Sequence, residues 1–261
     1  MIDLLSQNNF LQLAIITLIA ITTSSLGPYT LWQKLSYFGD ALSHSMLLGV
    51  VIGSFFAVNQ IFAIVSFCII FSLVFYFISS NKFFSKDTIT MILSYFCLAF
   101  AFLAVGDPEK LHDFIFGSLS GVTISDVWFL SILALISVIY SKIAFKKLLQ
   151  ININQDLAQI DGINVKFWQI SFLILLSCVI ALSVKVVGVF LMTALLILPA
   201  AIARIFSDSA KKMCLYTYFI SIGISLFSFS ASSYLGYEAG PVIILSFFAI
   251  FILSLLVKKQ K

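Results

Sequence analysis

Long apolar runs separated by short polar breaks dominate this chain. Each run reaches or approaches the roughly 20 residues that a helix needs to cross a hydrocarbon layer about 30 Å thick. We therefore expect nine membrane-spanning helices. Two breaks are narrow, at Asn59-Gln60 and at Lys185, so counts of eight and ten stay open. The predicted spans are residues 10–31, 40–57, 61–79, 89–105, 124–145, 167–184, 187–205, 213–230 and 241–257.

The residue pattern inside these runs favours helices over strands. A membrane β-barrel alternates apolar and polar residues at every second position, and the run 191–203 shows no such alternation. Composition agrees with lipid as the solvent, since only 10% of residues are charged and 61% are hydrophobic. We predict an all-α, polytopic transmembrane bundle. No linker or low-complexity tract interrupts residues 1–261, so we expect a single domain.

Basic residues gather in alternate breaks between the spans, which predicts the orientation. With the C-terminus in the cytoplasm, only Lys110 and Lys185 lie outside. The other basic residues, all inside, are Lys34, Lys82, Lys86, Lys142, Lys146, Lys147, Lys166, Arg204, Lys211, Lys212, Lys258, Lys259 and Lys261. They form no single stripe, so the net charge of +4 indicates no nucleic-acid partner. The first nine residues hold no Lys or Arg, and we expect the first span to be retained.

The sequence lacks the usual motifs of an enzyme. It contains no G-x-x-x-x-G-K-[ST] loop, so this chain cannot hydrolyse ATP through a P-loop. It also lacks H-E-x-x-H, and its two histidines are 68 positions apart, which disfavours a membrane metallohydrolase. The cysteines are scattered through apolar runs, and we interpret them as core residues. They are Cys68, Cys97, Cys178 and Cys214.

One apolar run carries two ionisable residues near its start. Asp40 and His44 are four positions apart, so on a helix they lie one turn from each other and could share one cation. A carboxylate and an imidazole suit zinc, manganese or iron. The alternative is structural, with Asp40 as the N-cap of the helix and His44 bonded to a backbone carbonyl. Beside this pair runs a ridge of small residues that suits close helix packing: Ala41, Ser45, Gly49, Gly53 and Ala57.

Three motifs in this order resemble the zinc/manganese/iron family of ABC permeases, often called ABC-3. Residues 39–45, G-D-A-L-S-H-S, are similar to its G-D-A-L-S-H-A signature, with Ser45 where alanine is usual. Residues 187–204 and the final Gly240-Pro241 are similar to two further signatures. Gln33-Lys34 stands where the family often has two basic residues. The resemblance implies an inner-membrane permease of an ATP-driven metal importer, most like that of a zinc-uptake system.

The resemblance also implies partners and site residues. It implies a permease homodimer around a central pathway, two cytoplasmic ATPase subunits and an extracytoplasmic metal-binding protein. The family's pathway carboxylate and histidine correspond to Asp40 and His44, which would touch the transported metal transiently. No permanently bound cofactor is expected.

A polar segment at about residues 150–166 is the second functional candidate. It could form a short helix that begins near Asn154 and ends at Gly162. Its spacing, with Asp156, Ala158 and Gly162, resembles the coupling segment that ABC importer permeases insert into their ATPase. A solvated linker is the alternative.

Weaker candidates are His112 and Asp113, in an exterior loop before a stretch similar to a family motif. They could receive the ion or contact the binding protein, or they could form an interfacial cap. Pro199 is expected to kink the seventh span, for gating or simply for packing.

Two alternative functions stay open from the sequence. One is a secondary transporter that moves a cation on an ion gradient, although we find no internal repeat and few acidic residues deep in a span. The other is the same ABC role for manganese or iron, because their ligand preferences overlap with those of zinc.

Overall fold

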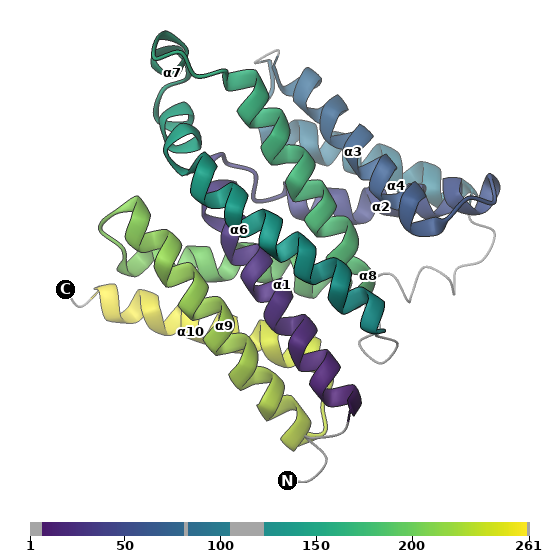
Figure 1. The fold of residues 1–261 in the computed structure, drawn as a ribbon, viewed down its shortest axis with the longest axis vertical. Coiled ribbons are helices and arrows are strands. Elements are labelled where there is room, and N and C mark those ends of the chain that lie inside the picture. Colours follow the sequence, from purple (N-terminus) through teal and green to yellow (C-terminus); the bar gives the residue numbers. More distant parts are fainter. Residues whose placement is uncertain (1–6, 81–82, 105–122, 260–261) are drawn as a thin grey trace. The chain divides into compact units, whose positions relative to one another are not determined.

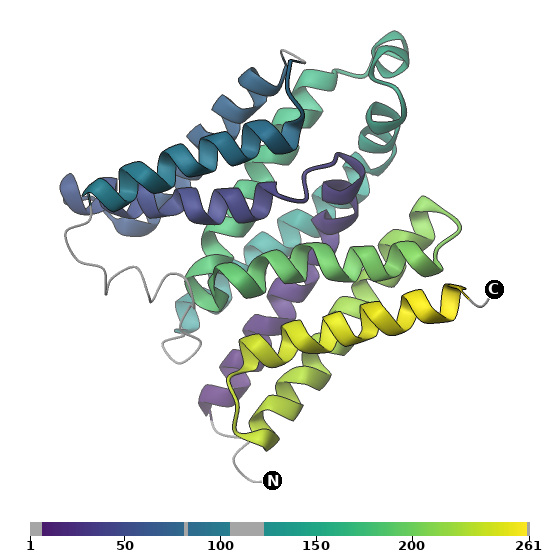
Figure 2. The same cartoon turned by 180° about the vertical axis from the view of Figure 1, so that it is seen from behind.

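The computed structural model describes residues 7–80, 83–104 and 123–259, and within them all regular secondary structure is helical (Figures 1 and 2). These described residues contain nine segments that are long and apolar enough to cross a membrane. The all-α prediction and the count of nine are therefore confirmed. The helices are α1 Gln7–Trp32, α2 Phe38–Phe55, α3 Gln60–Ser79, α4 Lys86–Ala104, α6 Ile124–Ile153, α7 Gln155–Ile160, α8 Val165–Phe206, α9 Ala210–Leu235 and α10 Ala239–Lys259.

Local capping explains where several of these helices begin and end. The Asn59 side chain accepts hydrogen bonds from the backbone amides of Ile61 and Phe62, and so caps α3. The narrow break at Asn59-Gln60 therefore does separate two helices. Ser209 caps α9 in the same way, and Gly236 ends it in the left-handed conformation.

Helix α8 supplies two of the nine spans, Val165–Val184 and Val186–Phe206. Its backbone leaves helical geometry at Gly188, where φ is 77° and ψ is 169°. That conformation is open essentially to glycine alone. The backbone break thus falls three residues after Lys185, where the sequence predicted the boundary. Pro199 lies inside the helical stretch that follows.

The contacts divide the chain into two compact units. The first holds α1 up to Leu31, α6 up to Ser141, α8 from Phe190, and all of α9 and α10. In this unit Tyr29 donates a hydrogen bond to the backbone carbonyl of Ser141 at 2.8 Å, which ties α1 to α6. A Cβ on Gly27 would lie 2.5 Å from the carbonyl oxygen of Leu196, so only glycine permits this approach of α1 to α8.

The second unit holds α2, α3, α4, α7, the part of α6 from Lys142 and the part of α8 up to Val189. Helix α2 packs against both α3 and α4 (Figure 1). Its first residue, Phe38, is fully buried, with its ring 5.0 Å from that of Phe75 and 6.1 Å from that of Phe71. This aromatic cluster fixes the start of α2 against α3.

Large apolar side chains remain exposed along several of the spans. On α10, for example, Leu245 is 66% exposed and Leu253 is 59% exposed. In water such surfaces would favour aggregation, whereas in lipid they face hydrocarbon. The exposure pattern therefore agrees with a multi-pass membrane protein.

Candidate metal pathway and coupling helix

The start of α2 places Asp40 inside the helix rather than at its cap. Tyr37 occupies the N-cap position and makes no side-chain capping hydrogen bond. Asp40 is the third helical residue, where its negative charge suits the positive end of the helix dipole. The interpretation of Asp40 as the N-cap is therefore wrong, and its carboxylate is free for another role.

Asp40 and His44 lie together, as their spacing predicts. His44 Nε2 is 3.5 Å from Asp40 Oδ1. The His44 side chain is 33% exposed and that of Asp40 42% exposed. Every other residue from Phe38 to Gly49 is buried. The pair is thus the one opening on an otherwise covered half-helix, and both side chains can reach a ligand outside the packed core.

The small-residue ridge of α2 lies on the neighbouring face and packs against α3. A Cβ on Gly49 would come 3.1 Å from the Cα of Ile64, and one on Gly53 would come 3.0 Å from the Cβ of Ala63. These close approaches confirm the interpretation of the ridge as a packing surface. Ala57 is not part of it, because α2 ends at Phe55 and Ala57 has a φ of 51°.

The described part of the chain contains no cluster of three or more His, Cys, Asp or Glu side chains that could hold a metal ion. Asp40 and His44 together carry two groups of the kinds that bind zinc, whereas a closed zinc site ordinarily has four ligands. His112 and Asp113 lie outside the described residues. All four cysteines are free thiols.

The predicted short helix of the polar segment is present as α7. The Asn154 side chain accepts hydrogen bonds from the amides of Asp156 and Leu157, which starts the helix at Gln155. Gly162 follows it with a φ of 78°, which favours glycine. Both predicted ends of the helix are thus confirmed within about two residues.

Of the three residues that the sequence singles out in this segment, Ala158 is the one that packs against the rest of the chain. Ala158 is only 1% exposed and packs in a small cluster with Ile151 and Val165. It therefore anchors α7 to its own chain and offers no surface to a partner. Leu157, 58% exposed, and Ile160, 81% exposed, are the apolar side chains that α7 displays. A helical projection of the sequence would have separated Leu157 and Ile160 from Ala158, because they lie on other faces of the same helix.

Comparison with known proteins gives consistent relationships over almost the whole chain. The model of the ABC 3 transport family matches residues 7–258. The High-affinity zinc uptake system membrane protein ZnuB of Haemophilus influenzae is 34% identical, over 93% of this chain and 94% of that protein. The Manganese import system permease protein ScaB of Streptococcus gordonii is 28% identical, over 97% of this chain and 93% of that protein.

A solved structure shares the fold. PsaBC from Streptococcus pneumoniae, in complex with Fab, superposes with a TM-score of 0.83 at 24% identity, over 97% of this chain and 93% of that one. This likeness shows that the two chains share one helical fold. The match to a transport family also confirms the prediction that this chain is a transport protein and not an enzyme. This chain belongs to the ABC 3 transport family.

Proposed function

We propose that this chain is the membrane permease of an ATP-driven importer for a divalent transition-metal ion, with zinc as the principal cargo. The observation that carries the proposal is the Asp40–His44 pair, the only opening on a buried half-helix, in a chain of this family. Zinc is favoured over manganese because two relatives named for zinc uptake are 34% and 32% identical, whereas relatives named for manganese import or transport are 28–29% identical. Carboxylate and imidazole ligands suit both ions.

The pathway would form between two copies of the chain. One copy offers two ligands, so two copies facing each other would offer two carboxylates and two imidazoles to a passing ion. Such a ring must bind weakly enough to release its cargo. Partial and transient coordination, rather than a closed tetrahedral site, fits two side chains that are each one third or more exposed.

Energy would come from two ATPase subunits that contact α7 on the cytoplasmic side. We assign the contact to Leu157 and Ile160, with Asp156 beside them, since these side chains are exposed. Ala158 would have an indirect role, because its packing against the rest of the chain holds α7 in place. Gly162 would allow the sharp exit toward α8. The whole of residues 1–261 would act as one permease domain in the inner membrane, because α1, α6 and α8 each contribute to both compact units.

An extracytoplasmic metal-binding protein would deliver the ion on the opposite side. The loop that carries His112 and Asp113 is its proposed contact, or the first acceptor of the ion. Membership of an ABC family favours this arrangement over an ion-gradient transporter.

Reconstitution tests the proposal directly. The full chain, its ATPase and its binding protein are placed in proteoliposomes, and radioactive zinc accumulation is followed with and without ATP. We expect ATP-dependent zinc entry that excess unlabelled zinc suppresses more strongly than equal manganese. Zinc entry that needs an ion gradient and ignores ATP would contradict the proposal, and stronger suppression by manganese would reassign the cargo.

A further inference from the structure

A cavity with polar, basic and apolar walls lies within the second unit, apart from the Asp40–His44 pair. It consists of two adjoining spaces of about 160 Å³ and about 490 Å³. Gln33, Lys86, Gln155 and Gln169 line both of them. The larger space lies within the range of about 300–1,000 Å³ that small-molecule sites occupy.

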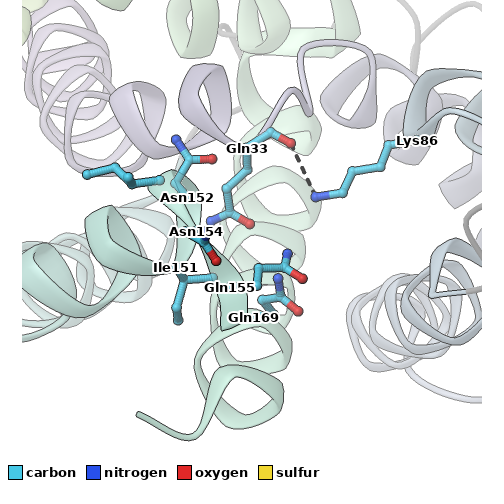
Figure 3. A pocket seen from close by; sticks show the side chains of 8 residues that line it. Gln33, Lys86, Ile151, Asn152, Asn154, Gln155 and Gln169 are labelled. Atoms are coloured by element: carbon cyan, nitrogen blue, oxygen red, sulfur yellow. Dashed lines mark hydrogen bonds between the residues drawn. The ribbon is translucent and has the colours of Figure 1, made fainter. Parts of the chain in front are cut away.

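Gln33 gives the strongest sign that this cavity binds something. The residue is only 9% exposed, and its side-chain Nε2 has no hydrogen-bond partner among the described residues. A buried amide left without a partner is costly, at about 1–3 kcal/mol. Figure 3 shows this side chain extending toward Asn154, with the amides of Gln155 and Gln169 beyond it. A ligand that accepts hydrogen bonds there would satisfy the buried amide.

Lys86 supplies a positive charge at the same place. Its Nζ donates to the backbone carbonyl of Gln33 at 3.3 Å (Figure 3). An ammonium has three N–H donors, so two remain for a ligand. Lys166 also lines the larger space, and no carboxylate lines either one. The cavity therefore repels a divalent cation and suits an anion with several acceptor oxygens.

The location of the cavity favours a lipid as the source of that anion. The walls of the larger space come from the residues just after α1, the end of α3, the starts of α4 and α8, and α7. All of these except α7 lie at the ends of candidate membrane spans. Tyr76 and the 64% exposed Phe84 line it too, and aromatic side chains are enriched at the level of the lipid headgroups. Basic pockets between transmembrane helices are known to hold anionic headgroups.

We propose that this cavity binds a phosphate group, carried by the headgroup of an anionic phospholipid, through Lys86, Gln33 and Gln169. The phosphate oxygens accept hydrogen bonds from the Lys86 ammonium and from the two amides. The phospholipid would thereby brace the ends of α1, α4 and α8 next to α7. This proposal is independent of the identity of the transported metal.

The test compares lipid retention by the full-length wild-type chain and by variants, using native mass spectrometry in detergent with added phosphatidylglycerol or phosphatidylcholine. A parallel titration uses inorganic phosphate alone. We expect wild type to hold phosphatidylglycerol over phosphatidylcholine, and Lys86→Gln and Gln33→Leu each to weaken that binding about tenfold. Lys86→Arg, which keeps the charge, should restore most of it. Lys146→Gln removes an exposed lysine of the same unit outside the cavity, and should bind as wild type does.

Each outcome decides the proposal. Phosphatidylglycerol binding that depends on Lys86 while inorganic phosphate fails to bind supports a lipid site. Inorganic phosphate binding that depends on Lys86 supports the phosphate site with a free anion as its ligand. Equal retention by wild type and Lys86→Gln, with monodisperse folded protein in both, overturns it. Loss of ATPase assembly in Lys86→Gln without any change in anion binding also overturns it, and assigns the cavity to the partner subunit.

Discussion

The start of α2 and the short helix α7 follow opposite rules of exposure. From Phe38 to Gly49 of α2 the apolar and small residues are buried, and two ionisable side chains, Asp40 and His44, are the ones left open. In α7 the polar residues are exposed as expected, but so are two large apolar side chains, Leu157 and Ile160, while the small Ala158 is buried. The membrane helix α2 thus exposes ionisable side chains, and the polar helix α7 exposes apolar ones.

This contrast separates two kinds of functional surface. An open carboxylate and imidazole in a membrane helix are costly unless a cation or a partner uses them. Exposed leucine and isoleucine on a polar helix are costly unless a protein covers them. Departures from local rules are expected where function requires them. The comparison therefore supports the proposed ion contact at α2 and the proposed protein contact at α7.

The most decisive prediction concerns the side of the membrane that α7 faces. Four spans follow α7 in the described chain, two in α8 and one each in α9 and α10, so the C-terminus must lie on the same side as α7. We expect a reporter fused after Lys261 to be active in the cytoplasm, in accord with the basic residues on that side. Activity only in the periplasm would remove α7 from reach of an ATPase.

Removing either open ligand of α2 should have the next largest effect. Asp40→Ala and His44→Ala each delete one ligand per copy, and we expect zinc uptake to fall on the order of 10- to 100-fold. Val51→Ala, a partly exposed position later in α2, is the matched control and should transport normally. Uptake is measured in zinc-starved cells at equal membrane expression. Normal uptake in both alanine variants would make the pair structural.

The exposed apolar side chains of α7 should matter for coupling. Leu157→Asp and Ile160→Asp place a charge where a partner would cover apolar surface, and we expect stimulated ATP hydrolysis and transport to fall about tenfold. Asn164→Asp adds the same charge to an exposed residue beyond α7 and keeps an oxygen for the amide of Phe167. Co-purification of the ATPase with each variant measures the contact. Equal recovery from all three would show that the partner binds elsewhere.

Gly162 offers a finer test of the same region. Its φ of 78° disfavours any side chain, and a Cβ there would meet no atom within 4 Å. The penalty for Gly162→Leu is therefore in the backbone alone, about 1–2 kcal/mol. We expect a several-fold loss of coupled transport in a folded, inserted permease. Gly162→Asn, which tolerates this conformation, should lose less, and equal losses would instead indicate a steric effect of the partner.

Much of this architecture was predictable because lipid imposes simple rules on sequence. The nine spans and the ends of α7 follow from apolar length and from capping residues such as Asn154. The closeness of Asp40 and His44 follows from helical spacing alone. The face of a helix that packs against the core cannot be predicted from spacing alone, because it depends on residues that are distant in sequence. Burial of Ala158 by Ile151 and Val165, and the cavity between Gln33 and Lys86, are of this kind.

The smallest predicted effect is the pH dependence of ion passage through α2. Only a neutral imidazole can ligate a metal, so protonation of His44 removes its ligand. Histidine ordinarily titrates near pH 6.5, and lowering the pH from about 7.5 to about 6.5 should therefore reduce uptake through the pair. We expect about a twofold fall beyond any shared with His44→Ala, because about half of the imidazoles stay neutral at the lower pH. The measurement is the ratio of zinc uptake by wild type to that by His44→Ala, taken at both pH values in the same reconstituted system. A ratio that stays constant would mean that the His44 imidazole does not contact the ion, and would leave Asp40 as the ligand that α2 contributes.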